Sequence, residues 1–363
     1  MAILPRYILI EFLKLLTILL TALLMIFFTI YFLERMNWFL ERQASLSLVA
    51  QHLLLKLPKM ISDLMPLALF LSSLLTVGIL SKNNEIVPIM SAGISIVALT
   101  TPILLIGAVM SGIFFYLNGS FVPSTHKAAR VIQKERIEKG GIGGTLLQNK
   151  IWIRLNGKTL LYTRLVDSKK NGLVGVHFYY LGGQQPIEAE IEAEMLHFEK
   201  GQWILLNGVQ IDYEKDGTTL RTPFARKEVK IGKTLLELQQ MEVEPDEMTY
   251  DQLQSYVDQL KKDGLNRTRY QVDLYRKYAL PLSNFILVLI GVAIASQYSR
   301  QRAIAKSVLT GLAIFLLYWL SLSITLALGR MEILSPVQAS WGPHILFLLL
   351  GGYQFYHLHR VAG

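Results

Sequence analysis

The sequence predicts an α-helical membrane protein with six transmembrane helices and an inserted domain of antiparallel β-strands. Composition is the first observation: 52% of the 363 residues are hydrophobic and only 17% are charged, which is too apolar for an ordinary soluble protein. The charged residues also cluster and leave long charge-free runs between them. In addition, the block between Lys127 and Lys277 changes to short alternating segments separated by turn signals.

Six runs contain no Asp, Glu, Lys or Arg, and each is close to or above the roughly 20 residues that a helix needs to cross about 30 Å of hydrocarbon. They cover residues 15–33, 64–81, 94–117, 278–299, 307–329 and 333–359. The first is too long for the core of a signal peptide and has no small-residue cleavage site after it, so we expect a permanent span.

The runs divide the chain into residues 1–126 with three spans, residues 127–270 with the β domain, and residues 271–363 with three more spans. Both termini then share one side of the membrane with the loops at 82–93 and 300–306. Seven basic residues fall on that side and five fall in the short loops opposite. The positive-inside rule places the termini in the cytoplasm and the β domain outside.

The β domain is expected to be a sandwich or a partly open barrel. Runs at 151–155, 160–166 and 203–206 have strand character. Hairpin-type turns are expected at Asn156-Gly157, Asn171-Gly172, Asn207-Gly208 and Asp216-Gly217. A helix over 250–262 should follow, capped by Thr249 and stopped by Gly264.

Residues 187–195 alternate strictly between apolar residues and four glutamates. This pattern buries one face of a strand and leaves the glutamates on the other. Neighbours on one face are about 7 Å apart, too far to converge on a cation without help from elsewhere. A solvated face is therefore favoured over a cation site.

The connection after the second span predicts a short helix near 84–93 that lies flat at the membrane. Its apolar face comprises Ile86, Ile89, Met90 and Gly93. Asn83 or Asn84 can cap it, Glu85 suits its positive end, and Gly93 can end it. We expect this face to find nothing of its own chain to pack on, so it either dips into lipid headgroups or docks a partner. The amphipathic stretch before the second span is expected to break at Pro58.

Several chemistries are absent. The chain has no cysteine, no HExxH and no GxSxG, and Lys227 stands where a P-loop before Gly232-Lys233-Thr234 needs glycine. His357 and His359 favour an interfacial tail over a metal site. The span cores lack the ionisable groups that a proton- or sodium-coupled transporter needs. If this chain moves a substrate, the energy comes from a partner, and we expect no enzymatic activity and no cofactor in the chain itself.

Three segments carry a resemblance. Residues 84–93, residues 269–277 before Pro281-Leu282, and residues 329–343 resemble the LptF/LptG permease family of the lipopolysaccharide exporter, and the likeness covers essentially the whole chain. Residues 32–36 and the pattern Tyr270…Lys277…Pro281 are more similar to the LptG branch than to LptF.

The resemblance implies an inner-membrane heterodimer with an LptF-like permease, on an LptB-like ATPase dimer that binds ATP and magnesium. It also implies an LptC-like single-span partner, and a jelly-roll-like periplasmic β domain along the route of lipopolysaccharide toward a periplasmic bridge. The coupling glutamate of the family falls on Glu85. Its phosphate-binding cations fall on Lys59 and Arg130, while Arg35 stands near Asn37 and Trp38, where some relatives carry lysines.

Two other functions stay open at this stage: a permease for another ATP-driven system, such as lipoprotein release, and a membrane scaffold without transport. The β domain also leaves two possibilities. Its apolar inner face, with Trp152, Leu161, Ile191 and Trp203 as candidates, either guides acyl chains or forms a filled core.

Overall fold

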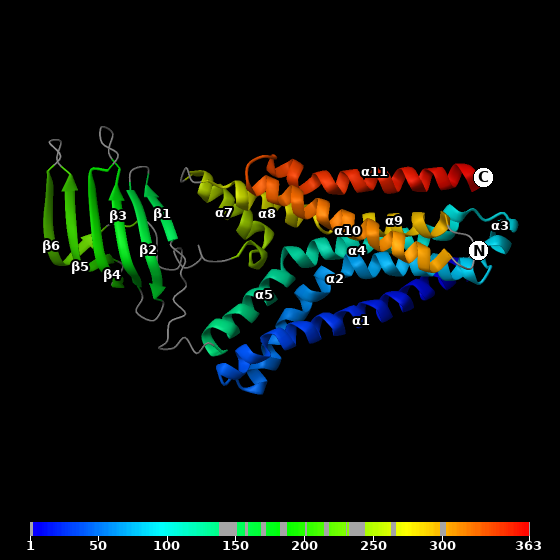
Figure 1. Ribbon diagram of the computed structural model, residues 1–363, viewed down its shortest axis with the longest axis horizontal. Coiled ribbons are helices and arrows are strands. Elements are labelled where there is room, and N and C mark those ends of the chain that lie inside the picture. Colours follow the sequence, from blue (N-terminus) through cyan, green and yellow to red (C-terminus); the bar gives the residue numbers. More distant parts are fainter. Residues whose placement is uncertain are drawn as a thin grey trace. The chain divides into compact units, whose positions relative to one another are not determined.

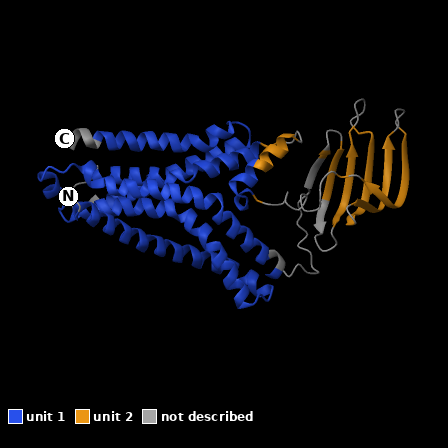
Figure 2. Ribbon diagram, turned by 180° about the vertical axis from the view of Figure 1, so that it is seen from behind, with its two compact units in different colours: residues 1–139, 245–254, 268–363 blue, residues 140–244, 255–267 orange. Residues whose placement is uncertain are grey.

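The structure is a computed structural model that describes residues 3–137, 151–156, 159–167, 172–181, 187–199, 202–213, 218–229, 231, 244–262, 266–297 and 303–362. Two compact units divide the chain. A helical unit holds residues 1–139, 245–254 and 268–363, and a second unit holds residues 140–244 and 255–267 (Figure 2). The helical unit thus continues past the predicted boundary at residue 126, and it includes residues 245–254, which the predicted boundaries place in the β domain.

Among the described residues, the helical unit contains nine α-helices that belong to it entirely, the start of α7 and two shorter helical turns. They are α1 (Ile3–Glu41), α2 (Leu46–Lys82), α3 (Ile86–Ser91), α4 (Ile96–Gly119), α5 (Phe121–Val131), the π-helix η1 (Ile132–Ile137), the 3-10 helix η2 (Pro245–Glu247), α7 (Tyr250–Lys262), α8 (Thr268–Ala279), α9 (Leu282–Gln297), α10 (Ala303–Arg330) and α11 (Pro336–Ala362). Within this unit α3 lies at the end where α1 begins and α11 ends (Figure 1).

Several helices are long and apolar enough to cross a membrane. Among the described residues these are α1, α2, α4 and α10, and the pair α8–α9, bent by 51°, makes a fifth if it forms one span. The sixth predicted span falls on α11, which is 27 residues long but carries Gln338, His344 and Gln354. The multi-pass character is confirmed, and the count of six stays a prediction.

Two of these helices are much longer than their charge-free runs. α1 has 39 residues, about 58 Å at 1.5 Å per residue, so the amphipathic lead-in and the first span are one helix. α2 has 37 residues and continues through Pro58 and Pro66. The predicted break at Pro58 is therefore wrong. Neighbouring helices and a local adjustment of the backbone can satisfy the groups that proline frees in a membrane helix.

The packing centre of the helical unit is α2, whose side chains Ala68, Leu69, Phe70 and Leu74 are fully buried. Small residues let α9 approach it closely. A Cβ on Gly291 would contact Ser73 Oγ and lie 2.9 Å from the carbonyl oxygen of Phe70. Membrane helices associate through close approach at small residues of this kind, because lipid tails provide no hydrophobic driving force between helices.

Six antiparallel strands form one sheet in the second unit: β1 (Ile151–Asn156), β2 (Thr159–Asp167), β3 (Gly172–Tyr180), β4 (Ala189–Glu199), β5 (Gln202–Tyr213) and β6 (Thr219–Val229). The strand order follows the sequence (Figure 1). This order is a meander, whereas a sandwich or a jelly roll distributes its strands over two sheets. The described strands therefore confirm the antiparallel β character but not the two-sheet arrangement.

The alternation predicted for β4 is confirmed. Ile191 and Ala193 are buried, and Glu192 and Glu194 between and after them are exposed. Ile191 pairs with Phe178, which in turn pairs with Leu161, so one apolar row crosses three strands. Leu161, Ile191 and Trp203 belong to the same buried cluster, with at most 2% of each side chain exposed. The side chain of Trp152 lies outside the described residues.

The turn predicted at Asn207-Gly208 is wrong, because both residues lie inside the continuous strand β5. Asn207 does have the left-handed φ of 49° that favours asparagine in turns. Gly208 is needed for a different reason: a Cβ there would lie 2.5 Å from Glu192 O and 2.5 Å from Phe224 Cζ. Close packing between neighbouring strands, and not a reversal of the chain, explains this glycine.

The helix predicted over 250–262 is confirmed as α7. Thr249 Oγ1 accepts a hydrogen bond from Gln252 N at 3.3 Å, and Gln252 Oε1 accepts one from Thr249 N at 3.0 Å. This reciprocal arrangement is a capping box. Gly264, the predicted stop, lies outside the described residues.

We expect Gly291→Ala to destabilise the helical unit. Overpacking costs about 1–3 kcal/mol, and the higher helix propensity of alanine offsets roughly 1 kcal/mol of that. Thermal unfolding in detergent would measure the change. Gly112→Ala in α4 is the matched control, because no atom lies within 4 Å of a Cβ there. Equal melting temperatures for the two variants would contradict the close contact between α2 and α9.

Candidate functional site

Two of the predicted phosphate-binding cations lie against carboxylates of one short segment. Lys59 in α2 donates to Asp63 Oδ1 at 2.9 Å, and its Nζ lies 3.7 Å from Asp246 Oδ2 in η2. Arg130 in α5 donates from Nη1 to Glu247 Oε2 at 2.8 Å. The structure thus brings both cations to η2, although neither carboxylate was predicted to take part.

A third cation, Arg276 of α8, joins the same cluster. Its Nη2 donates to Asp246 Oδ1, and its Nε lies 3.8 Å from Asp273 Oδ1 one turn earlier. Asp273 also accepts a hydrogen bond from Arg330 Nη2 at 2.6 Å. We call Lys59, Arg130, Arg276 and Lys277, with Asp246 and Glu247, the charged cluster.

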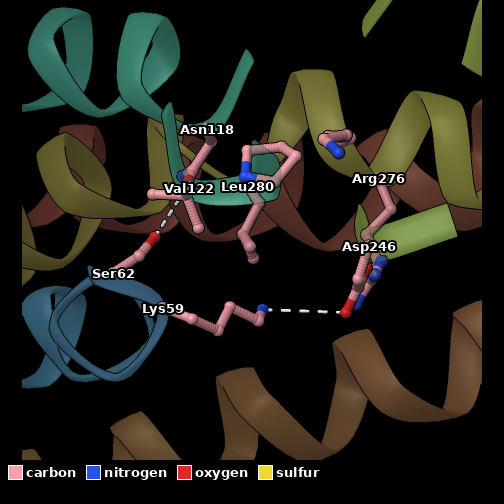
Figure 3. A pocket seen from close by; sticks show the side chains of 9 residues that line it. Lys59, Ser62, Asn118, Val122, Asp246, Arg276 and Leu280 are labelled. Atoms are coloured by element: carbon pink, nitrogen blue, oxygen red, sulfur yellow. Dashed lines mark hydrogen bonds and ion pairs between the residues drawn. The ribbon is translucent and has the colours of Figure 1, made fainter. Parts of the chain in front are cut away.

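Four members of the charged cluster, Lys59, Asp246, Arg276 and Lys277, line an open recess with about 400 Å³ of empty space, part of it continuous with solvent. Figure 3 shows Lys59 extending across the recess toward Asp246, with Arg276 on the other side of that carboxylate. The opposite wall contains the hydrogen bond from Ser62 Oγ to Asn118 Oδ1, at 2.7 Å. The lining comprises Lys59, Ser62, Asn118, Val122, Pro123, Asp246, Arg276, Lys277 and Leu280.

Positive charge dominates this recess. Burial by itself raises the pKa of the Asp246 carboxyl, but the charges of Arg276, Lys59 and Lys277 outweigh burial and hold that pKa below its ordinary value. Asp246 is therefore ionised at neutral pH and accepts from its cationic neighbours. A recess with such electrostatics can hold an oxyanion such as a carboxylate or a phosphate.

Arg35, the third predicted phosphate-binding residue, lies in a different environment. Its guanidinium carbon is 5.9 Å from the ring centroid of Tyr31 and 5.9 Å from that of Trp38. Lys56 Nζ lies 4.6 Å from the same Tyr31 ring, and Arg42 lies over Trp38. Arg35 is thus part of a cation–aromatic cluster at the end of α1 and the start of α2.

At the other predicted site, the chain around α3 is held by paired helix-ending motifs. Asn84 has a left-handed φ of 57°, and hydrogen bonds from Asn84 N to Ser81 O and from Glu85 N to Leu80 O end α2. Gly93, at φ 82°, ends α3 in the same manner through Gly93 N to Met90 O. The predicted stop at Gly93 is confirmed. Asn83 and Asn84 end α2 instead of capping α3, whose N-cap is Glu85.

The predicted freedom of the apolar face of α3 is wrong. Ile86 and Ile89 are half-buried and pack against the main apolar core of the helical unit, and Met90 is half-buried too. The outward face is instead formed by Val87, 62% exposed, with Pro88 beside it. The six residues of α3 form two faces. The face with the two isoleucines packs against the core, because burial of their apolar side chains is favourable.

The carboxylate of Glu85 has partners on both oxygens. Tyr7 in α1 donates its hydroxyl to Glu85 Oε2 at 3.1 Å, and Asn83 Nδ2 donates to Oε1 at 3.0 Å. Tyr7 is 78 residues away in the sequence, so no local pattern could have indicated this contact. These two hydrogen bonds hold the carboxylate at the surface.

No metal centre is found in the described part of the chain, where no group of three or more His, Asp and Glu side chains is placed to hold an ion. His177 of β3 lies beside the glutamates of β4: its Nδ1 is 3.3 Å from Glu190 Oε1, and its Nε2 is 3.9 Å from Glu192 Oε1. The side chain of His359 lies outside the described residues.

Comparison with known proteins gives consistent matches. Residues 6–357 match the family described as lipopolysaccharide export system permease LptF/LptG. The lipopolysaccharide export system permease protein LptG of Haemophilus influenzae is 22% identical over 307 residues, which cover 82% of each chain. LptG of Escherichia coli K12 is 23% identical over 311 residues, which cover 84% of this chain and 81% of the relative.

The match extends over nearly the whole sequence, and it includes both the long apolar helices and the inserted antiparallel sheet. The named relatives are LptG proteins, in agreement with the branch indicated by residues 32–36 and 270–281. The chain belongs to the LptF/LptG family of lipopolysaccharide export permeases, in its LptG branch.

Proposed function

We propose that this chain is a permease subunit of an ATP-driven exporter that extracts lipopolysaccharide from the inner membrane toward a periplasmic bridge. The match to the permease family over residues 6–357 carries the proposal. In this assembly the chain pairs with an LptF-like permease, and an LptB-like ATPase dimer binds the ATP and magnesium. An LptC-like single-span protein receives the lipid.

In the proposed orientation the termini and α3 face the cytoplasm, and the β domain lies in the periplasm. Supporting this, α3 lies at the end of the helical unit where α1 begins and α11 ends (Figure 1). In the charged cluster, Arg130 precedes the inserted β domain in the sequence, and Asp246 and Glu247 follow it. The cluster would then lie near the outer membrane surface, where lipid phosphates are found.

We propose that Glu85 is the charged contact to the ATPase, with Val87 and Pro88 beside it on the exposed face of α3. The role predicted for Ile86, Ile89, Met90 and Gly93 becomes one of support, since the two isoleucines pack against the core, Met90 is half-buried and Gly93 ends the helix. A carboxylate held by Tyr7 and Asn83 is positioned before the partner arrives, so little conformational entropy is lost on docking.

The first test is Glu85→Ala. Removing a charge-assisted hydrogen bond worth about 2 kcal/mol should weaken ATPase binding roughly thirtyfold. Membrane levels of the permease should stay unchanged, because the carboxylate is on the surface. The ratio of ATPase to permease after co-purification, together with lipopolysaccharide release, measures the effect.

Tyr7→Phe is the matched control for this test. It removes the internal hydrogen bond to Glu85 and keeps the carboxylate, so most of the ATPase should still co-purify. Normal export by Glu85→Ala would contradict the docking role. Equal losses in the two variants would mean that Glu85 acts only inside its own chain.

The second test concerns Lys59 and Arg130 as ligands of lipid phosphates. Simple charge reversal at Arg130 would place a second carboxylate beside Glu247, which is only 4% exposed, and would disturb folding. We therefore expect Lys59→Gln with Arg130→Gln and Glu247→Gln to keep the fold and lose at least tenfold in co-purified lipopolysaccharide, because two phosphate contacts are gone.

Lys261→Gln with Lys262→Gln controls for the loss of two positive charges, since both lysines are exposed at the end of α7. Adding Arg35→Gln to the variant with Lys59→Gln, Arg130→Gln and Glu247→Gln tests whether the cation–aromatic cluster contributes to lipopolysaccharide binding. Lipid occupancy equal to that of the control would show that Lys59 and Arg130 merely interact with headgroups as any membrane protein does.

The third test concerns the β domain. Leu161 and Ile191 are 0% and 2% exposed in a filled apolar cluster, so we expect a photocrosslinker at Ile191 to form no lipopolysaccharide adduct, even during ATP hydrolysis. A crosslinker at the exposed Glu192 on the opposite face serves as the control. Adducts at Ile191 but not at Glu192 would mean that acyl chains pass along the inner face of this sheet.

A further inference from the structure

The charged cluster has a property that the family resemblance does not explain. The two cations assigned to lipid phosphates are paired with adjacent carboxylates of their own chain, Lys59 with Asp246 and Arg130 with Glu247. Arg276 pairs with the same Asp246. Three cations from three helices thus converge on two consecutive residues of η2.

A phosphate binds such cations more strongly than a carboxylate does. A phosphate monoester carries about −1.5 to −2 charges and three acceptor oxygens, whereas a carboxylate carries one charge and two oxygens. A phosphate can also accept paired hydrogen bonds from a guanidinium, with shorter and stronger geometry. The side chain of Asp246 is 35% exposed and borders the open recess. An incoming phosphate can therefore reach Lys59 and Arg276, the partners of Asp246, before it reaches Arg130.

Glu247 is the more enclosed partner. It is 4% exposed and Arg130 is 24% exposed, so this pair is shielded from water and from salt. Displacement of Glu247 from Arg130 by a phosphate depends on displacement of Asp246, because the two residues are consecutive and share one turn of η2.

The segment that carries both carboxylates is also the connection to the other unit. Residues 245–254 belong to the helical unit, while residues 140–244 before them and 255–267 after them belong to the β-containing unit. Besides the ion pairs, Lys277 Nζ donates to the carbonyl oxygens of Pro245 and Met248. Tyr250 donates to Phe115 O at 3.0 Å. Most polar contacts on the first half of the segment therefore involve the cations of the charged cluster.

We propose that Asp246 and Glu247 are internal counter-anions that occupy the phosphate site of the lipid-free chain. A lipid phosphate displaces them, with Arg276 as a further phosphate ligand beside Lys59 and Arg130, and this loosens residues 245–248 from the helices. The inference rests on the proposed function, and it adds a new phosphate ligand and a consequence of lipid binding for the connection to the β-containing unit.

The binding test compares lipid A carrying its phosphates with the same lipid after dephosphorylation, on the full chain in nanodiscs. Asp246→Asn with Glu247→Gln should bind the phosphorylated lipid at least tenfold more tightly than the unmodified chain. Affinity for the dephosphorylated lipid should not change. Asp246→Asn alone should show a smaller gain, and it remains informative if the double variant folds poorly.

Asp63→Asn is the matched control. It removes the other carboxylate bonded to Lys59 but leaves Asp246 and Glu247 in place. It should raise lipid affinity less than the double variant does, and it should leave the segment attached.

A distance measurement tests the loosening directly, and the absence of cysteine makes labelling simple. Spin labels at Leu54→Cys in α2 and Asp251→Cys in α7 lie on exposed positions of the helical unit. Phosphorylated lipid A should change the distance distribution, and dephosphorylated lipid should not. The Asp246→Asn, Glu247→Gln chain should show the changed distribution without lipid. Inorganic phosphate at millimolar concentration should have no effect if the ligand is a lipid headgroup.

The outcomes separate this proposal from the proposed function. Phosphate-dependent lipid binding, with unchanged affinity in the double variant and an unchanged label distance, would overturn the exchange and leave the proposed function intact. Failure of every variant to prefer phosphorylated lipid would overturn both. A change in distance with inorganic phosphate alone would contradict the choice of a lipid headgroup as the ligand.

Discussion

The close packing of other helices around α2 is the constraint on which the helical unit depends. In α2, 67% of the most apolar stretch is buried within the chain, against 6% in α1, 28% in α4 and 22% in α10. Serines and a threonine on its buried face bond within the helix, as Ser72 Oγ does to Ala68 O and Thr76 Oγ1 to Ser72 O. Their polar groups are thus satisfied without a partner, and their small size allows close approach.

This helix also connects the two candidate sites. Lys59 lies within α2, and Glu85 follows three residues after its last residue, Lys82. The distance along the helix from Lys59 to Lys82 is about 35 Å at 1.5 Å per residue, slightly more than the hydrocarbon thickness. Because α2 is one continuous helix, a tilt of α2 would displace its end near the charged cluster and its end near Glu85 together. Pro66 lies between Lys59 and Lys82, and the link is direct because α2 continues through it.

Much of the fold could be predicted because it depends on local pattern. Charge-free runs mark the long helices, strict alternation marks β4, and Thr249 marks the start of α7. Proline and Asn-Gly signals failed where tertiary packing outweighs them: α2 continues through Pro58, and β5 continues through Asn207 because Gly208 lies against its neighbouring strands. The prediction that the apolar face of α3 has no partner in its own chain was also wrong, since the sequence does not show that Ile86 and Ile89 pack against the core.

The candidate sites were predictable only in part. Lys59, Arg130 and Glu85 could be named by resemblance, but their partners lie far along the chain: Glu247 is 117 positions after Arg130, and Tyr7 is 78 positions before Glu85. Such pairs arise from the packing of helices, which one sequence does not encode in any spacing. Asp246 carries no motif, and Arg276 lies in the family-like segment 269–277 without any pattern that singles it out. Their convergence on one recess is what indicates a role.

The central claim is that this chain moves lipopolysaccharide when a partner hydrolyses ATP. Proteoliposomes containing this permease, an LptF-like partner, the ATPase dimer and the LptC-like protein would test it most directly, with a soluble periplasmic acceptor outside. The account predicts lipopolysaccharide transfer to the acceptor that requires ATP, magnesium and this chain. Transfer at the same rate without this chain, or ATP hydrolysis with no transfer in the complete assembly, would contradict it.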